Sequence, residues 1–235
     1  TGAFTLGSPN RSWTSPLSRD VGLRLYVDFE NNIYDRSGNG NVTSWYGSSV
    51  SRYTTTNGLN TNYTGNFVRA NGDFVNLGNT LNNLGLLSIV AWFNFDAYGS
   101  GDRQIIVNSE QSYENGISTT GRFDSAFSRY TCSNWSWFGS SSVWNLNTWY
   151  FVVSTWDGYF ARHYVNGNID YVFDLSDGNI ATTCNCHTKI GARGCSASSG
   201  VALFSGYIDD VKIYERALSA EEIMKIYNNT KNKYQ

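Results

Sequence analysis

The sequence FSGYIDDVKIYERALSAEEIMKIY, residues 204–227, contains a strand candidate followed at once by a helix candidate. Residues 206–214 are typical of a strand. Ser219-Ala220-Glu221-Glu222 is a capping box, the pattern that starts a helix. The apolar residues that follow have helical spacing, which predicts a short helix over residues 220–228. Such a helix can bury its apolar stripe only against a sheet.

The chain upstream of this segment is typical of an all-β protein. From Leu23 to Phe29, apolar residues alternate with polar ones, which indicates a half-buried strand. Asp157-Gly158 and Asn166-Gly167 are hairpin turn signals. Further strand candidates cover residues 67–70, 74–77, 88–95, 104–108, 116–119, 151–156, 161–165, 169–173 and 188–191. We therefore predict a two-sheet antiparallel β-sandwich with one short C-terminal helix over residues 21–235, preceded by an extended arm or linker over residues 1–20.

Composition excludes several other classes of protein. The 235 residues include 16% aromatic and 15% charged residues, with a formal net charge of -2. So few basic residues argue against a nucleic acid held by its phosphates. The chain has no apolar run long enough to span a bilayer as a helix. Helix-forming residues are scarce, which disfavours an all-α or a doubly wound α/β fold.

The order of the segments resembles the laminin-G-like jelly rolls of the concanavalin A-like lectin/glucanase superfamily. The matching pieces are LRLYVDFENNIYDRSGNGN (23–41), ANGDFVNLG (70–78), SIVAWFNF (88–95), NTWYFVVSTWDGYFARHYVNGN (147–168), KIGA (189–192) and the segment 204–227. They occur in the family's order from about residue 22 to residue 228. The resemblance implies two antiparallel sheets packed face to face, one of them concave.

Four cysteines, Cys132, Cys184, Cys186 and Cys195, occur in a chain rich in Ser, Thr and Asn. An even number predicts disulfides and an oxidising, extracellular or cell-surface location. Three pairings are possible, and the sequence does not choose among them, although we expect the 184–195 segment to take part. Free thiols, or a metal site with His187, are the alternatives, and C-x-C-H is not a usual zinc spacing. If the protein is secreted, N-glycosylation can occur at Asn10, Asn41, Asn62, Asn134 and Asn228.

Tryptophans provide the candidate ligand site. Trp135, Trp137 and Trp144 lie among Ser, Asn and Gly in residues 129–147. Trp135 and Trp137 have the same parity, so on a strand they share one face. Flat exposed aromatic rings suit the apolar faces of sugars, which predicts a glycan-binding site here, with Trp45 as a weaker candidate. The alternative is that these tryptophans pack a long loop beside Cys132.

Calcium is the candidate cofactor. The turn DRSGNGN, residues 35–41, supplies Asp35, Asn39 and free carbonyl oxygens, which are ligands that calcium prefers. The resemblance implies a structural calcium between this segment and the Gly-x-Ile-Asp-Asp strand, with Asp28, Asp35 and Asp209 at the matching positions. In the alternative interpretation, Asp35 and Asn39 only cap a turn, and Asp209 accepts backbone hydrogen bonds.

Catalysis is disfavoured. The Glu-x-Asp-x-x-Glu run of the family's glucanases is absent, and neither His163 nor His187 lies in a lyase motif. We therefore expect an extracellular, non-catalytic, lectin-like domain that binds a glycan or a glycoprotein surface. One alternative is a structural subunit of a surface assembly, such as a filament, pilus-like thread or virion, in which residues 1–20 add a strand to another copy. A glycan-active hydrolase or lyase is the second alternative.

Overall fold

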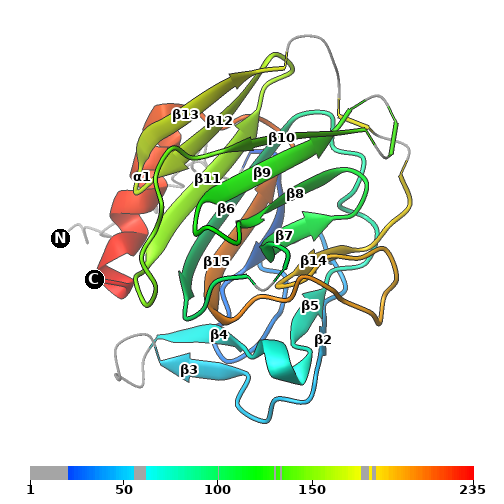
Figure 1. Ribbon diagram of the computed structural model, residues 1–235, viewed down its shortest axis with the longest axis vertical. Coiled ribbons are helices and arrows are strands. Elements are labelled where there is room, and N and C mark those ends of the chain that lie inside the picture. The colour runs from blue at the N-terminus through cyan, green and yellow to red at the C-terminus, as the bar shows by residue number, and fades with distance from the viewer. Residues whose placement is uncertain are drawn as a thin grey trace, which may run out of the picture.

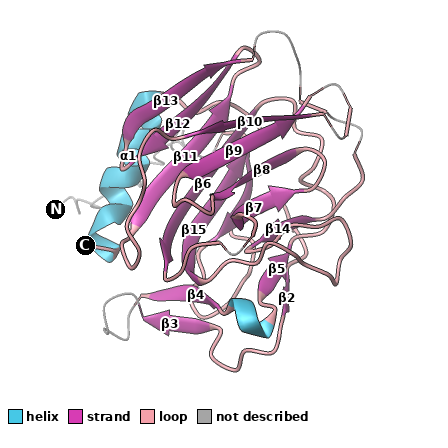
Figure 2. Ribbon diagram, viewed as in Figure 1, coloured by secondary structure: helices cyan, strands magenta, loops and turns pink. Residues whose placement is uncertain are grey.

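The computed structural model describes residues 21–55, 62–99, 101–129, 131–132, 134–175, 180–181 and 184–235. Within this part of the chain, the strands form an eight-stranded and a seven-stranded sheet, and one α-helix follows them (Figure 1; Figure 2). All strand pairs are antiparallel, which confirms the predicted β-sandwich. The arm predicted over residues 1–20 lies outside the described residues.

The eight-stranded sheet, sheet A, has the order β13-β12-β11-β6-β15-β4-β3, and β1 also pairs with β15. Its hairpin turn at Asn166-Gly167 has positive φ at both residues, 49° and 83°, as a type I′ turn requires. The strands of sheet A are β1 (Leu23–Val27), β3 (Tyr53–Thr55), β4 (Tyr63–Phe67), β6 (Leu87–Phe95), β11 (Tyr150–Trp156), β12 (Phe160–Val165), β13 (Asn168–Asp174) and β15 (Gly206–Tyr214).

The seven-stranded sheet, sheet B, has the order β10-β9-β8-β7-β14-β5-β2. Its strands are β2 (Ser44–Tyr46), β5 (Phe74–Asn76), β7 (Gln104–Ser109), β8 (Tyr113–Ile117), β9 (Phe123–Ser128), β10 (Trp135–Gly139) and β14 (Thr188–Ile190). β2, β9 and β10 were not among the predicted strands. β9 carries Ser125 on its buried face, where the hydroxyl bonds to Ser154 of sheet A at 2.8 Å, and this inward polar residue obscures the alternation.

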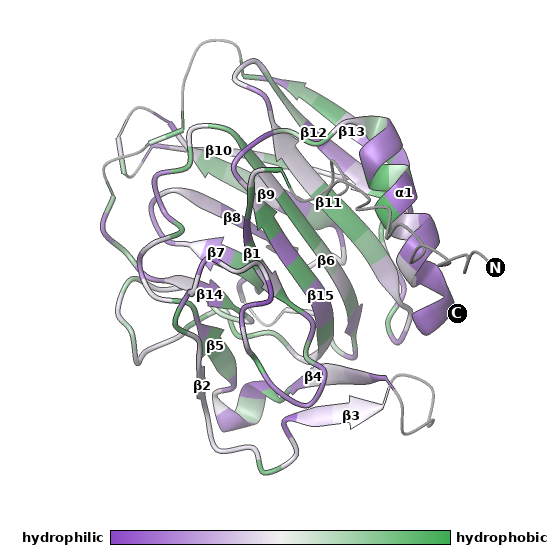
Figure 3. Cartoon of the chain, turned by 180° about the vertical axis from the view of Figure 1, so that it is seen from behind, coloured by the Kyte–Doolittle hydropathy of each residue, from purple (hydrophilic) through white to green (hydrophobic). Residues whose placement is uncertain are grey.

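The main core lies between the two sheets. Side chains such as Phe93, Phe123, Ile106 and Ile213 are completely buried there. Figure 3 shows the hydrophobic residues concentrated on the central strands of the sandwich, while the visible surface of the helix is mostly hydrophilic. Burial of these rings and branched chains is the main stabilising contribution to the fold.

A second, smaller core covers the outer face of sheet A. Helix α1 (Ala220–Thr230) begins with the expected capping box, in which Ser219 Oγ accepts from Glu222 N at 3.3 Å. Ile223 and Ile226 pack against outward residues of sheet A, Trp92 among them. A short 3₁₀ helix, η3 (Lys231–Lys233), then places the ring of Tyr234 4.1 Å from that of Trp92. No helix in the described part of the chain has the length and apolar character that a membrane crossing requires.

The outer face of sheet B is covered differently. The connection from β14 to β15, residues 191–205, crosses it and is called the β14–β15 loop below (Figure 1). This loop contacts Asn108 of β7 and Glu114 of β8 through hydrogen bonds. Beyond it, at the edge of this sheet, Trp135 and Trp137 of β10 are partly exposed.

Candidate functional site

Trp135 and Trp137 lie on β10, the edge strand of sheet B. Phe138, which directly follows Trp137, points into the core, where its ring lies 5.4 Å from that of Phe127. Successive side chains of a strand point to opposite faces, so Trp135 and Trp137 both lie on the outer face. Both are partly exposed, and their ring centroids are 6.2 Å apart at 32°. The predicted shared face is confirmed, and the two rings together are called the aromatic platform below.

Arg103 joins the aromatic platform to the sheet. Its guanidinium carbon lies 3.8 Å from the centroid of the Trp137 ring, and its Nε donates to Asp124 Oδ2 at 3.0 Å. The Asp124 carboxylate lies over Gly139, where a Cβ would come within 2.3 Å of Oδ1. Burial raises the pKa of Asp124, while the neighbouring Arg103 lowers it. Gly139 is thus the residue that makes space for the carboxylate that positions Arg103.

Two small hollows adjoin Arg103. One, of about 200 Å³, is lined by Arg69, Gly99, Asp102, Arg103, Ala202 and Leu203. The other, of about 170 Å³, is lined by Gly101, Asp102, Arg103, Ser118 and Thr119. Both combine hydrogen-bond donors and acceptors in a small space, which is suitable for a hydroxylated ligand. The sequence carried no motif for this part of the site, because its residues come from separate connections.

The β14–β15 loop bounds the platform on the other side. Arg193 forms ion pairs with Glu114 at 2.6 Å and with Asp102 at 2.7 Å. The N–H of Gly194 donates to Asn108 Oδ1 at 3.3 Å, and Lys189 Nζ donates to the Gly194 carbonyl. Burial raises the pKa of Glu114, which the ion pair with Arg193 opposes, and burial lowers the pKa of Lys189 to about 8. The loop is therefore attached to the sheet by buried polar contacts.

All four cysteines are paired, as Cys132–Cys184 and Cys186–Cys195. The first bond connects the turn before β10 to the segment before β14, and the second joins the first part of the β14–β15 loop to the segment before β14. Both bonds involve the 184–195 segment, as expected from the sequence, which had left the pairing open. The disulfides thus stabilise the two segments on either side of the aromatic platform.

Two of the predicted site tryptophans, Trp144 and Trp45, are not part of the aromatic platform, and a role for them in glycan binding stays a prediction. Trp144 is only 4% exposed and stacks on Tyr150 at 4.6 Å in the main core. Trp45 packs inward on Phe67, with ring centroids 4.9 Å apart. Polar neighbours in the sequence had suggested exposure, but the chain around Trp144 folds back onto the sandwich.

The turn that was expected to bind calcium is tied by its own hydrogen bonds. Asp35 accepts from Tyr26 N at 3.1 Å and from Ser37 N at 2.8 Å, and these bonds lower its pKa although burial opposes them. Asn39 donates to the Leu23 carbonyl at 2.9 Å. Asp28 forms an ion pair with Arg36 at 3.1 Å. These contacts fit the turn-capping interpretation.

Asp209 forms an ion pair with Lys233. It is completely buried, lies 2.9 Å from Lys233 Nζ and accepts from the Tyr234 hydroxyl at 2.9 Å. Burial raises the pKa of Asp209 well above its usual range, and Lys233 opposes this effect. No three metal-ligating His, Cys, Asp or Glu side chains of the described residues gather into one site. As arranged, these donors do not fit calcium without displacing Lys233, and calcium binding stays a prediction.

The two histidines lie in different surroundings. His163 is completely buried, its Nε2 lies 2.8 Å from Ser125 Oγ, and burial lowers its pKa to about 3. It is therefore a neutral side chain of the core. His187 Nδ1 lies 3.0 Å from Asn76 Oδ1 on the other half of sheet B.

The acceptor asparagines differ in exposure. Asn134 and Asn228 are exposed, whereas Asn41 and Asn62 are partly buried, and Asn10 lies outside the described residues. Asn134 directly precedes Trp135.

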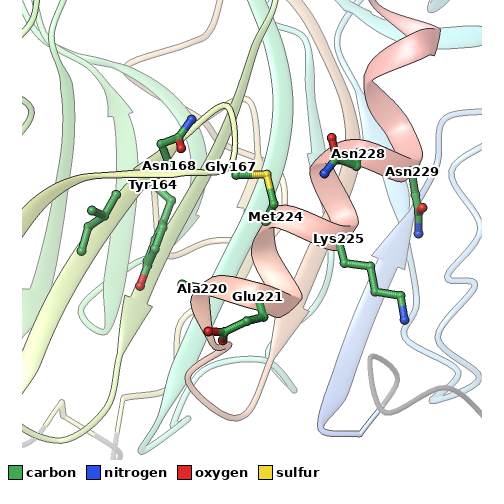
Figure 4. A pocket seen from close by; sticks show the side chains of 10 residues that line it. Tyr164, Gly167, Asn168, Ala220, Glu221, Met224, Lys225, Asn228 and Asn229 are labelled. Atoms are coloured by element: carbon green, nitrogen blue, oxygen red, sulfur yellow. The ribbon is translucent and has the colours of Figure 1, made fainter.

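A larger groove, missed in the sequence, lies between α1 and the β12–β13 hairpin. It has a volume of about 690 Å³ and is lined by residues such as Tyr164, Ile169 and Met224. Figure 4 shows the Met224 sulfur next to Gly167, where a Cβ would lie 2.9 Å from it. Its lining mixes apolar and amide side chains with one acidic residue, Glu221, and one basic residue, Lys225, so the groove by itself points to no specific ligand.

Comparison with known proteins gives one family and several similar folds. The family model described as concanavalin A-like lectin/glucanases superfamily matches residues 69–224. A search of curated proteins finds no match. Among solved structures, domain 4 of AbnA, a GH43 extracellular arabinanase from Geobacillus stearothermophilus, was determined with arabinotriose. It has a TM-score of 0.64 at 15% identity, over 87% of this chain and 98% of that one.

Toxin binding domains are also similar in fold. The binding domain of Paraclostridial Mosquitocidal Protein 1 has a TM-score of 0.70 at 15% identity, over 91% of this chain and 53% of that one. The ligand-binding domain of botulinum neurotoxin serotype D, determined with N-acetylneuraminic acid, has a TM-score of 0.63 at 18% identity, over 90% and 51%. The chain spans about half the length of these toxin domains. At such identities the likeness establishes the fold alone.

Proposed function

The chain belongs to the concanavalin A-like lectin/glucanase superfamily, and from this premise we propose that it is an extracellular carbohydrate-binding domain without catalytic activity. The aromatic platform on β10 is the proposed contact surface. The observation that carries the proposal is the position of Trp135 and Trp137: both are partly exposed on the outer face of an edge strand. Among the described tryptophans, Trp92, Trp144 and Trp156 are buried instead.

The chemistry of the platform suits a sugar. A partly exposed indole buries the C–H face of a sugar ring, and Arg103 and Asp124 beside it offer donors and acceptors to hydroxyl groups. Only the Nε of Arg103 donates to Asp124, so its terminal N–H groups are free of protein hydrogen bonds among the described residues. Arg103 and Arg193 are balanced by Asp124, Asp102 and Glu114. Paired charges of this kind favour an uncharged ligand over a strongly anionic one.

The non-catalytic part of the proposal is supported by the state of the ionisable groups. A glycosidase needs two accessible carboxyl groups on either side of the scissile bond. Glu114 is 1% exposed and bound to Arg193, and Asp124 is bound to Arg103. His163 is inside the core. These groups serve to hold side chains in place.

Similar proteins support a glycan as the ligand class. The AbnA domain was determined with arabinotriose, and the botulinum serotype D domain with N-acetylneuraminic acid. Two disulfides fit an oxidising compartment, where a glycan or glycoprotein surface is available as a partner.

The test is a glycan array followed by calorimetry on the Trp135→Ala, Trp137→Ala double variant. We expect the parent to bind at least one glycan and the double variant to lose that binding while it stays folded. Trp149→Ala is the matched control, because Trp149 is also partly exposed but packs in the α1 core, next to Tyr234. Glycan binding that survives in the double variant would contradict the proposed site.

A second candidate function, a subunit of a surface assembly, is favoured by one observation. β13 is an edge strand of sheet A, and its Ile169 and Val172 are 56% and 47% exposed. An exposed apolar edge strand can accept a strand from another molecule. Sedimentation velocity over a concentration series tests this, and self-association that is abolished by Val172→Lys would support it.

A further inference from the structure

We propose that the platform binds the end of a glycan chain and not an internal stretch of one. This inference rests on the proposed function. It follows from the two sides of the platform, each of which is closed by a side chain or a loop that the sheet holds in place.

In the direction across the strands, the β14–β15 loop prevents a bound glycan from extending beyond the platform. The register places Trp137, Ala126, Glu114, Asn108 and Lys189 in one row on the outer face, from β10 to β14. Glu114 is 1% exposed, and Asn108 and Lys189 are not exposed at all. Ala126 on β9 is not exposed either, so the row is open only at Trp137 and covered from β9 onward.

The loop is fixed in this position by several contacts. Arg193 reaches down to Glu114 in the middle of the row, and Gly194 contacts both Asn108 and Lys189. The Cys186–Cys195 bond joins the first part of the loop to the segment before β14. If the loop moved away, Arg193 would separate from Glu114, and this carboxylate would stay partly buried without a cation. A buried charge without a partner destabilises the protein. The β14–β15 loop therefore blocks this end of the row permanently and does not open as a lid would.

Along β10, the path is closed by Arg103. Its guanidinium covers one face of Trp137 and is held there by Asp124. A glycan that stacks on Trp135 and extends toward Trp137 therefore meets Arg103 and the hollow of about 170 Å³ beside it. That hollow contains Asp102, Arg103, Ser118 and Thr119, which can bond to the hydroxyls of a terminal sugar.

The uncovered part of the face is short. It consists of β10 alone, because Ala126 and Ser128 of β9 are completely buried, and since neighbouring strands are about 4.8 Å apart its width is roughly 5 Å. A polysaccharide that continued in both directions would collide with the loop or with Arg103. A chain end, or a short side branch, fits without moving either.

The test compares binding per chain end with binding per sugar unit. Size-fractionated oligosaccharides and the parent polysaccharides of arabinan, xylan and β-glucan are titrated by calorimetry, with chain ends counted chemically. We expect affinity per chain end to vary by less than about twofold beyond the first two units. Affinity that continues to rise with chain length, by about tenfold for each 1.4 kcal/mol that an added unit contributes, would overturn the inference.

The two proposals fail in different ways. Length-dependent binding that is lost in Trp135→Ala, Trp137→Ala overturns chain-end recognition and leaves the proposed function intact. No binding to any of the three series, together with an empty glycan array, overturns both.

A loop variant gives an independent readout. In Cys186→Ser, Cys195→Ser the loop loses its covalent attachment to the segment before β14, and we expect longer oligosaccharides to gain affinity relative to short ones. The Lys225→Ala variant is the control, because Lys225 lies on α1 beyond the opposite sheet. The same length profile in the parent and in a folded, loop-released variant would contradict the role of the loop.

Discussion

The guanidinium of Arg103 covers one face of the Trp137 ring at 3.8 Å, while its Nε is held by Asp124 at 3.0 Å. One side chain thus connects the aromatic platform to the polar hollows beside it. The contact is local in space but joins residues from two separate parts of the chain, the β6–β7 connection and β10.

Replacing Arg103 is expected to weaken ligand binding with little effect on folding. A cation–π contact at a partly exposed site contributes about 0.5–1 kcal/mol. We therefore expect Arg103→Ala to lower the free energy of unfolding by at most about 1 kcal/mol, measured by urea denaturation, and to reduce glycan affinity in calorimetry. Arg103→Lys is the control that keeps the charge without the planar stack. Unchanged affinity in both variants would exclude Arg103 from the site.

Replacement of the tryptophans in residues 129–147 by alanine should destabilise the protein by different amounts. Trp144 is buried, so Trp144→Ala should destabilise the protein by about 3–5 kcal/mol. Trp135 is partly exposed on an edge strand, so Trp135→Ala should cost less than about 2 kcal/mol. Chemical denaturation of the two variants measures the difference. Equal costs would show that the platform is part of the core.

The two disulfides should contribute unequally to stability. Cys132–Cys184 has a sequence separation of 52, and Cys186–Cys195 a separation of 9. In the chain-entropy description these loops correspond to about 4 and about 2.5 kcal/mol. Serine double variants of each pair, compared by thermal denaturation, should therefore show the larger loss for Cys132–Cys184. Peptide mapping of the unreduced protein checks the pairing, and any other pairing would contradict the fold of this region.

The free energy of unfolding should decrease as the pH is lowered below about 6.5, because of His163. Burial lowers the folded-state pKa of His163 from 6.5 to about 3, so the unfolded chain takes up a proton first as the pH falls. The stabilisation is complete above pH 6.5 and is lost progressively toward pH 3, by about 1.4 kcal/mol per pH unit. Urea denaturation between pH 7 and 5 measures this slope. The matched variant His163→Gln, if it folds, should lack it, and an equal slope in both proteins would rule out His163 as the source.

A glycan on Asn134 should mask the platform. Asn134 is exposed and directly precedes Trp135, so an attached oligosaccharide would lie beside the proposed site. We expect protein produced in a glycosylating eukaryotic host to bind ligand more weakly than protein produced in bacteria. Asn134→Gln should remove the difference between hosts. Asn228→Gln, which changes an equally exposed acceptor on α1, should not.

Fold class, the C-terminal helix and the shared face of Trp135 and Trp137 could all be predicted from the amino-acid sequence. These features depend on local periodicity: alternation along strands, a capping box at Ser219, and equal parity of two residues on one strand. Patterns of this kind involve only residues that are close together in the sequence, so they can be interpreted without the rest of the chain.

Only the tertiary structure decided which tryptophans are exposed, how the cysteines pair and what surrounds the platform. Trp144 has polar neighbours in sequence but aromatic neighbours in space, since its loop folds back onto Tyr150. Arg103 meets Trp137, and Arg193 meets Glu114, across 34 and 79 positions of the chain. Such contacts depend on which strands lie side by side in a sheet, and strand order is fixed by packing over the whole sandwich and not by any local pattern.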